Sequence, residues 1–309
     1  MTRTKRARLG GGVALAATVL AVSAACSAGG ADDTPQVVVT TNILGDIVEQ
    51  VVGDQAEVTT LMKPNADPHS FEISARDAAL MERADLVVSN GLGLEEGVQQ
   101  HVDRAVDAGV PTFVAGDRIE VLDYADGDDS GAADPHFWTD PARVVDVVEA
   151  LEAELVEIPG VDAEAVRAQT AAYLADLETL DAEMIDAFAA IPAERRALVT
   201  NHHVFGYLAE RFDFEVIGAV IPGGTTLAAP SAADLRDLAS AIEAAGVPTI
   251  FAESSQPDRL VQVLASEAGI DVDVVGLFTE SLTAPGEGAD TYLDMMRANT
   301  ERIAQGLTR

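Results

Sequence analysis

The stretch that decides the fold is residues 162–190, DAEAVRAQTAAYLADLETLDAEMIDAFAA, which lies between Pro159 and Pro192 and contains neither Gly nor Pro. Its larger apolar residues recur at helical spacing and fall on one face. They are Val166, Tyr173, Leu177, Leu180, Met184 and Phe188. One helix of about 29 residues would be about 43 Å long. Most links between domains are flexible. An uninterrupted helix of this length is instead expected to connect two lobes rigidly.

Short apolar segments alternate with helical patterns on both sides of this helix. Before it, we expect strands at 37–41, 58–62, 86–89 and 112–115, and helices at 43–52, 74–83, 94–108 and 141–155. After it, we expect strands at 197–201, 215–221, 249–252 and 273–278, and helices at 204–212, 232–245, 258–268 and 291–307. Such alternation is typical of parallel sheets covered by helices. The sequence therefore predicts two similar α/β lobes, at 37–158 and 193–309, joined by a linking helix within 159–192.

The composition is that of a folded protein with room for two cores, since the chain has 309 residues of which 48% are hydrophobic and 23% charged. Acidic residues number 52 against 19 basic ones, for a net charge of −33. This surface repels a phosphate backbone, so we expect no nucleic-acid partner. It attracts cations, although an acidic surface also serves solubility and does not by itself define a function.

The amino terminus is expected to be an export signal rather than part of the fold. Basic residues at positions 3, 5, 6 and 8 precede an apolar run over 9–25. That run is shorter than the roughly 20 residues that span a bilayer as a helix, and small residues close it. Residues 1–25 are therefore predicted to be a signal peptide.

Cys26 is the only cysteine, so no internal disulfide can form. The string Ser23-Ala24-Ala25-Cys26 resembles the lipobox of bacterial lipoproteins, with Ser23 standing where a larger apolar residue is usual. We expect lipidation of Cys26, a flexible tether over 26–36 and an extracytoplasmic location at the cell membrane. The alternative is an ordinary signal peptide that happens to end near a cysteine.

Histidines gather where ligands bind in parallel sheets, beyond the carboxyl ends of the strands. His69 and His136 each end an Asp-Pro-His tripeptide, and His202 and His203 directly follow an expected strand. Any one of them alone would more often be a hydrogen-bonded or surface residue. Three such loops together favour a metal site, and the proline restricts the loop before each of the first two histidines. His101, in a helical segment, is expected to be an ordinary surface residue.

Several motifs across residues 37–309 resemble one family, the zinc- and manganese-binding solute-binding proteins of bacterial ABC importers, which are often lipoproteins. The motifs are Asp67-Pro68-His69 with Phe71-Glu72, His136-Phe137-Trp138 with Asp140-Pro141, His202 with Phe205-Gly206-Tyr207, and Gly288-Ala289-Asp290-Thr291-Tyr292 with Met295-Met296 and Asn299. The resemblance implies two lobes, a rigid linking helix and one metal ion in the cleft between the lobes.

The resemblance also implies a ligand set of His69 and His136 from the first lobe and His202 and Asp290 from the second. Three imidazoles and one carboxylate suit Zn²⁺ better than Mn²⁺, which prefers more oxygen ligands. Manganese binders of the family tend to carry a carboxylate at the position of His202, so zinc is expected and manganese is the alternative. His203 remains the alternative to its neighbour, and Asp290 could instead cap the following helix.

Three further segments have open interpretations. The acidic loop 123–134 contains no histidine, unlike the His-rich loop of many zinc-selective members, and it either attracts cations or is simply solvated. Gly223-Gly224 lacks the pattern of a phosphate loop and is expected to form a flexible surface turn. Glu253, at the end of a strand, is a candidate partner for a ligand histidine.

The predicted function is therefore capture of Zn²⁺ by a monomeric lipoprotein that delivers it to an ABC permease. A surface adhesin of the same fold is an alternative that the sequence does not separate. A secreted zinc hydrolase is the other alternative, but such an enzyme needs an open coordination position, and the chain lacks a His-Glu-x-x-His helix. We expect no enzymatic activity.

Overall fold

The computed structural model describes residues 34–125, 129–221, 223–253, 261–262, 264 and 272–308. The predicted signal peptide and Cys26 lie outside these residues, as does most of the helix expected at 258–268. Thr34–Arg309 form one compact unit. Within it we call residues 34–158 the amino-terminal lobe and residues 193–308 the carboxy-terminal lobe.

Each lobe contains one four-stranded parallel sheet. In the amino-terminal lobe the order is β2 (Glu57–Thr60), β1 (Gln36–Val39), β3 (Leu86–Ser89) and β4 (Thr112–Val114). In the carboxy-terminal lobe it is β6 (Glu215–Ala219), β5 (Ala197–Thr200), β7 (Thr249–Glu253) and β8 (Asp273–Leu277). All pairs are parallel and the two orders correspond, which confirms the predicted α/β class with two similar lobes.

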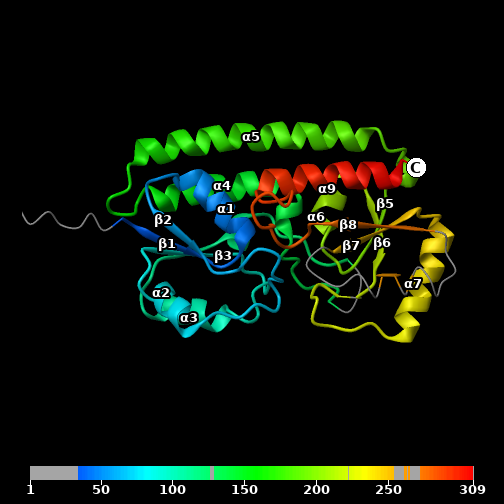
Figure 1. Cartoon of the computed structure of the whole chain (residues 1–309), viewed down its shortest axis with the longest axis horizontal. Coiled ribbons are helices and arrows are strands. Elements are labelled where there is room, and N and C mark those ends of the chain that lie inside the picture. Colours follow the sequence, from blue (N-terminus) through cyan, green and yellow to red (C-terminus); the bar gives the residue numbers. More distant parts are fainter. Residues whose placement is uncertain are drawn as a thin grey trace, which may run out of the picture. The chain divides into compact units, whose positions relative to one another are not determined.

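Helices cover both faces of each sheet. In the amino-terminal lobe α1 (Asn42–Val52) and α4 (Pro141–Leu155) cover one face, and α2 (Ala75–Met81) and α3 (Gln99–Asp107) cover the other (Figure 1). In the carboxy-terminal lobe α6 (Gly206–Phe212) and α9 (Tyr292–Leu307) lie opposite α7 (Ala232–Ala245). Among the described residues, no helix is long and apolar enough to cross a membrane.

The linking helix is α5 (Ala163–Ala189), which begins after Asp162 because the carboxylate of that residue accepts the N–H groups of Glu164 and Ala165. It runs beside α9 in Figure 1 and packs on α1, α4 and α9. Its six predicted core residues are all buried. They join one continuous hydrophobic core that includes the inner faces of both sheets. The lobes therefore share this core, and each lobe also has the separate core that the sequence predicted, on the other face of its sheet.

Helix α3 begins five residues later than predicted. Residues 94–98 are not helical, and the buried Glu95 carboxylate accepts the backbone N–H groups of Asn90 and Gly91 at 2.6 and 3.1 Å. Gly97 packs so closely that a Cβ would overlap the carbonyl oxygen of Phe71. Tertiary packing thus overrides the helical periodicity at this position.

Candidate metal centre

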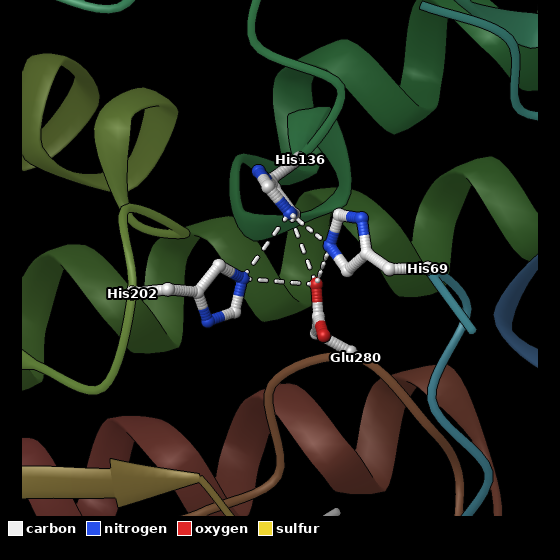
Figure 2. A group of neighbouring side chains, drawn as sticks. All are labelled: His69, His136, His202 and Glu280. Carbon is white, nitrogen blue, oxygen red and sulfur yellow. Dashed lines mark hydrogen bonds and ion pairs between the residues drawn. The ribbon is translucent and has the colours of Figure 1, made fainter. Parts of the chain in front are cut away.

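Four buried side chains from four loops meet at one point (Figure 2). His69 follows β2, His136 precedes α4, His202 follows β5 and Glu280 follows β8. Each offers one potential ligand atom, and these four atoms lie within 4.8 Å of one another. Among the described residues this is the group with metal-binding geometry.

Five of the six distances among these four atoms lie between 2.9 and 3.4 Å. Glu280 Oε1 lies 2.9, 3.0 and 3.1 Å from the Nε2 atoms of His69, His136 and His202. His136 Nε2 lies 3.4 Å from Nε2 of each of the other two histidines. Tetrahedral bonds of about 2.0–2.1 Å, as zinc makes to nitrogen and oxygen, would place ligand atoms about 3.3 Å apart. The group therefore matches the size of a four-coordinate zinc site.

The two Asp-Pro-His tripeptides fold in the same way. The Oδ1 atoms of Asp67 and Asp134 accept the backbone N–H groups of His69 and His136, both at 2.9 Å. This side chain to backbone bond, together with the restricted φ of proline, directs each imidazole inward. In both loops the Asp-Pro-His tripeptide thus fixes the orientation of its histidine.

In two of the imidazoles, a carboxylate faces Nδ1, the nitrogen that points away from the centre of the group. His136 Nδ1 lies 2.7 Å from Asp134 Oδ1, and His202 Nδ1 lies 3.2 Å from Glu253 Oε2. A proton on Nδ1 leaves the Nε2 lone pair free for a metal and makes the ring a better donor. The structure therefore places Glu253 where the sequence suggested, behind a candidate ligand.

The electrostatics of the group fit a competition between protons and a cation. Burial lowers the pKa of His136, but the carboxylates of Asp134 and Glu280 outweigh it and raise that pKa. Burial likewise lowers the pKa of His202, and Glu280 and Glu253 raise it well above its ordinary value. For Glu280, burial raises the pKa, yet the charges of His202 and His69 hold it well below the usual range. The buried negative charge of Glu280 thus stabilises positive charge next to it, either on protonated imidazoles or on a metal ion.

The structure does not bring the fourth ligand predicted from the sequence into this group. Asp290 is not in the group, and its Oδ2 accepts the N–H of Gly286 at 3.2 Å. It does not cap α9 either, because Thr291 is the N-cap of that helix. Glu280 has the fourth position. It lies two residues after the strand predicted at 273–278, so the rule that pointed to His202, proximity to a strand end, would also have indicated Glu280.

The structure also resolves the alternative between the paired histidines. His202 is fully buried within the group, whereas His203 is half-buried and its ring packs against Tyr124, with ring centroids 6.4 Å apart. His101 lies on α3 and is not part of the group.

The glycine pair and the acidic loop contact each other beside the site. Gly223 and Gly224 are buried, and a Cβ at Gly224 would overlap the ring of Tyr124. Asp129 Oδ2 accepts the N–H of Gly224 at 2.8 Å. The expectation of a flexible surface turn was therefore wrong. The acidic loop has a packing role here, although residues 126–128 lie outside the described part of the chain.

Two parallel sheets that bring four potential ligands into one buried group define a metal-binding α/β protein. Comparison with known proteins narrows this class, since the family model described as ZnuA, zinc-uptake complex component A, periplasmic, matches residues 37–306. The chain belongs to this family of metal-binding solute-binding proteins of ABC importers. Its members are transport components and not enzymes.

Relatives named for different metals are similar over nearly their whole length. The zinc-binding protein TroA of Treponema pallidum is 32% identical, over 90% of this chain and 91% of that protein. The manganese-binding lipoprotein MntA of Halalkalibacterium halodurans is 29% identical, over 94% and 97%. A solved structure of the periplasmic zinc-binding protein TroA superposes with a TM-score of 0.83 at 29% identity, covering 89% of this chain and all of TroA.

Proposed function

We propose that this protein captures Zn²⁺ through His69, His136, His202 and Glu280 and delivers it to the permease of an ABC importer. The observation that carries the proposal is the convergence of three imidazole nitrogens and one carboxylate oxygen in one buried group. These donor atoms are of borderline softness, and four protein ligands complete the coordination of a tetrahedral ion. Both features favour zinc over manganese. The metal is the transported cargo in this account.

One observation favours manganese as the second candidate. Glu280 Oε2 is buried and has no hydrogen-bond partner among the described residues. If both carboxylate oxygens bound one ion, the site would offer three nitrogens and two oxygens, a number and mixture of ligands that Mn²⁺ accepts more readily. The similarity to MntA, a protein named manganese-binding, also supports this second candidate.

Separate calorimetric titrations of residues 27–309 with Zn²⁺ and Mn²⁺ test the choice, combined with elemental analysis of the purified protein. We expect one equivalent of zinc to bind, and to bind more tightly than manganese. Tighter binding of manganese, or a purified protein that retains manganese alone, would reverse the assignment.

We further propose that the mature protein is a monomer tethered outside the cytoplasm through lipidated Cys26. Support comes from the lipobox-like sequence and from relatives that are named lipoproteins, among them MntA. Mass spectrometry of the native amino terminus should find a diacylated Cys26. An unmodified Cys26, or cleavage well beyond it, would reject the anchor while leaving the metal site intact.

A further inference from the structure

The loop that carries Glu280 belongs to the carboxy-terminal lobe in sequence, but a residue of the amino-terminal lobe holds it. Asn42, the first residue of α1, donates from Nδ2 to Ser281 Oγ at 2.8 Å. Its Oδ1 accepts the backbone N–H of Leu282 at 3.0 Å. Asn42 is 7% exposed and Glu280 is 1% exposed, so this exchange of hydrogen bonds is shielded from water.

Two more bonds attach the same loop to the amino-terminal lobe. The indole Nε1 of Trp138 donates to the carbonyl of Thr279 at 2.8 Å, and the backbone N–H of Asn65 donates to the carbonyl of Leu282 at 2.9 Å. The hydrogen-bond partners of the chain change from the carboxy-terminal lobe to the amino-terminal lobe between Phe278 and Thr279. Phe278, the preceding residue, is bound through both its N–H and its carbonyl by Asn299 of α9.

His202 is supported differently. Its carbonyl accepts the hydroxyl of Thr200 at 2.7 Å, and its Nδ1 faces Glu253, which also accepts a bond from Asn201 at 3.3 Å. These supports all come from the carboxy-terminal lobe. The group therefore divides into three side chains fixed to the amino-terminal lobe and one fixed to the carboxy-terminal lobe.

We propose that Asn42 is a positioning residue that holds Glu280 in the metal site by fastening residues 279–282 to the amino-terminal lobe. His69, His136 and Glu280 then form a preorganised three-ligand half of the site, and His202 completes it from the other lobe. This inference rests on the proposed ligand set. Removing the Asn42 side chain leaves the Leu282 N–H and the Ser281 hydroxyl without this partner, and the loop can then shift Oε1 away from the imidazoles.

A double-mutant cycle tests the proposal. Zinc affinity is measured by competition with a chromophoric chelator for the parent protein, Asn42→Ala, Glu280→Gln and the double variant. Loss of a residue that orients a metal ligand costs roughly 10- to 100-fold in affinity. We expect Asn42→Ala to fall in that range, Glu280→Gln to lose more, and the double variant to bind no more weakly than Glu280→Gln alone.

The visible spectrum of bound Co²⁺ gives a second measurement. The parent should show the intense bands of tetrahedral Co²⁺, and Asn42→Ala should shift or weaken them. Gln50→Ala removes an exposed amide from the same helix and should match the parent in both measurements. Ser281→Ala, which removes only one hydrogen-bonding oxygen, should give a smaller loss of affinity in the same direction and serves as the test if Asn42→Ala does not fold.

The outcomes separate this proposal from the proposed function. If Glu280→Gln binds zinc as tightly as the parent, the ligand set is wrong and the positioning role fails with it. If Glu280→Gln weakens binding but Asn42→Ala and Ser281→Ala do not, only the positioning role is overturned. An equal loss from Asn42→Ala in both backgrounds would also overturn it, because a purely structural effect does not depend on the Glu280 carboxylate.

Discussion

At the scale of single residues, the choice of metal is expected to depend on His202. Its replacement by Glu leaves two nitrogens and two carboxylates, which removes a borderline donor and adds a hard one. His202→Glu should therefore weaken zinc binding by at least about tenfold while manganese binding changes less or improves. Calorimetric titration with each metal measures both effects.

His203→Ala is the matched control for this substitution. The ring of His203 contacts Tyr124 and is outside the group of four, so zinc affinity should stay within about twofold of the parent. Loss of binding in His203→Ala together with normal zinc binding in His202→Glu would show that the wrong member of the pair had been assigned.

The raised pKa values of His136 and His202 predict how zinc binding depends on pH. Imidazoles must lose their protons to bind a metal, so zinc affinity should fall as the pH decreases from values above the ordinary histidine pKa of about 6.5. In the metal-free protein the raised histidine pKa values contribute stability at low pH that is lost as the pH rises through them. The lowered pKa of Glu280 contributes stability at pH values above the ordinary glutamate pKa, and that stability is lost as the pH falls through the lowered pKa.

Protons and zinc compete for the imidazoles over this range, whereas Glu280 stays ionised, so the increase in Tm caused by zinc should grow between about pH 6 and pH 8. Differential scanning fluorimetry with and without zinc measures this increase. A constant increase over the range would contradict a site in which protons and zinc compete for the same imidazoles.

The sequence was sufficient to locate three of the four residues in the group and insufficient for the last. Histidine is rare in this chain, so three of them in loops stand out, whereas Glu280 is one of 52 acidic residues. Asp290 lies in a motif that resembles the family, which is why the sequence predicted it as a ligand. The contacts of Asn42 with Ser281 and Leu282 join positions 239 and 240 apart in sequence and leave no local pattern.

At the scale of elements, the linking helix was predictable because its signals are local. Asp162 caps its first turn, no Gly or Pro interrupts it, and the apolar residues keep one spacing. The strands were located within one or two residues for the same reason. Helix α3 and the buried glycine pair were not, since both depend on contacts with Phe71, Tyr124 and Asp129, which are remote in sequence.

The buried face of α5 should account for much of the stability of the protein. Leu180 is fully buried, and Leu180→Ala should lower the free energy of unfolding by about 2–5 kcal/mol through lost apolar burial and the cavity that remains. Ile185 lies on the same helix and is 45% exposed, so Ile185→Ala should cost about 1 kcal/mol or less. Urea denaturation of the metal-free protein measures both. Equal losses from the two variants would contradict the assignment of the buried face.

At the scale of the whole molecule, the shared hydrophobic core predicts cooperative unfolding of the two lobes. The core joins residues of α1 and α4 to residues of α6 and α9 through α5. Fluorescence of Trp138, the single tryptophan, should report the same urea midpoint as far-UV circular dichroism. Two separated transitions would show that the lobes unfold independently.

The group of four side chains comes from loops of both lobes, so an ion bound there would hold the lobes together. A ligand that binds only the folded state stabilises it, by about 4 kcal/mol at a free concentration 1,000 times its Kd. If His69, His136 and Glu280 are held by the amino-terminal lobe, as we propose, withdrawal of His202 alone would open the site. Capture and release would then depend on one side chain and its support, Glu253.

X-ray absorption at the zinc edge tests the central claim most directly, since it reports the atoms bound to the ion in solution. For protein loaded with one equivalent of Zn²⁺, the account predicts four ligands at about 2.0–2.1 Å, of which three are imidazole nitrogens and one is a carboxylate oxygen. Asp290→Asn should leave this spectrum unchanged, and Glu280→Gln should alter it. A six-coordinate shell of oxygen atoms, or a shell with fewer than two imidazoles, would contradict the account.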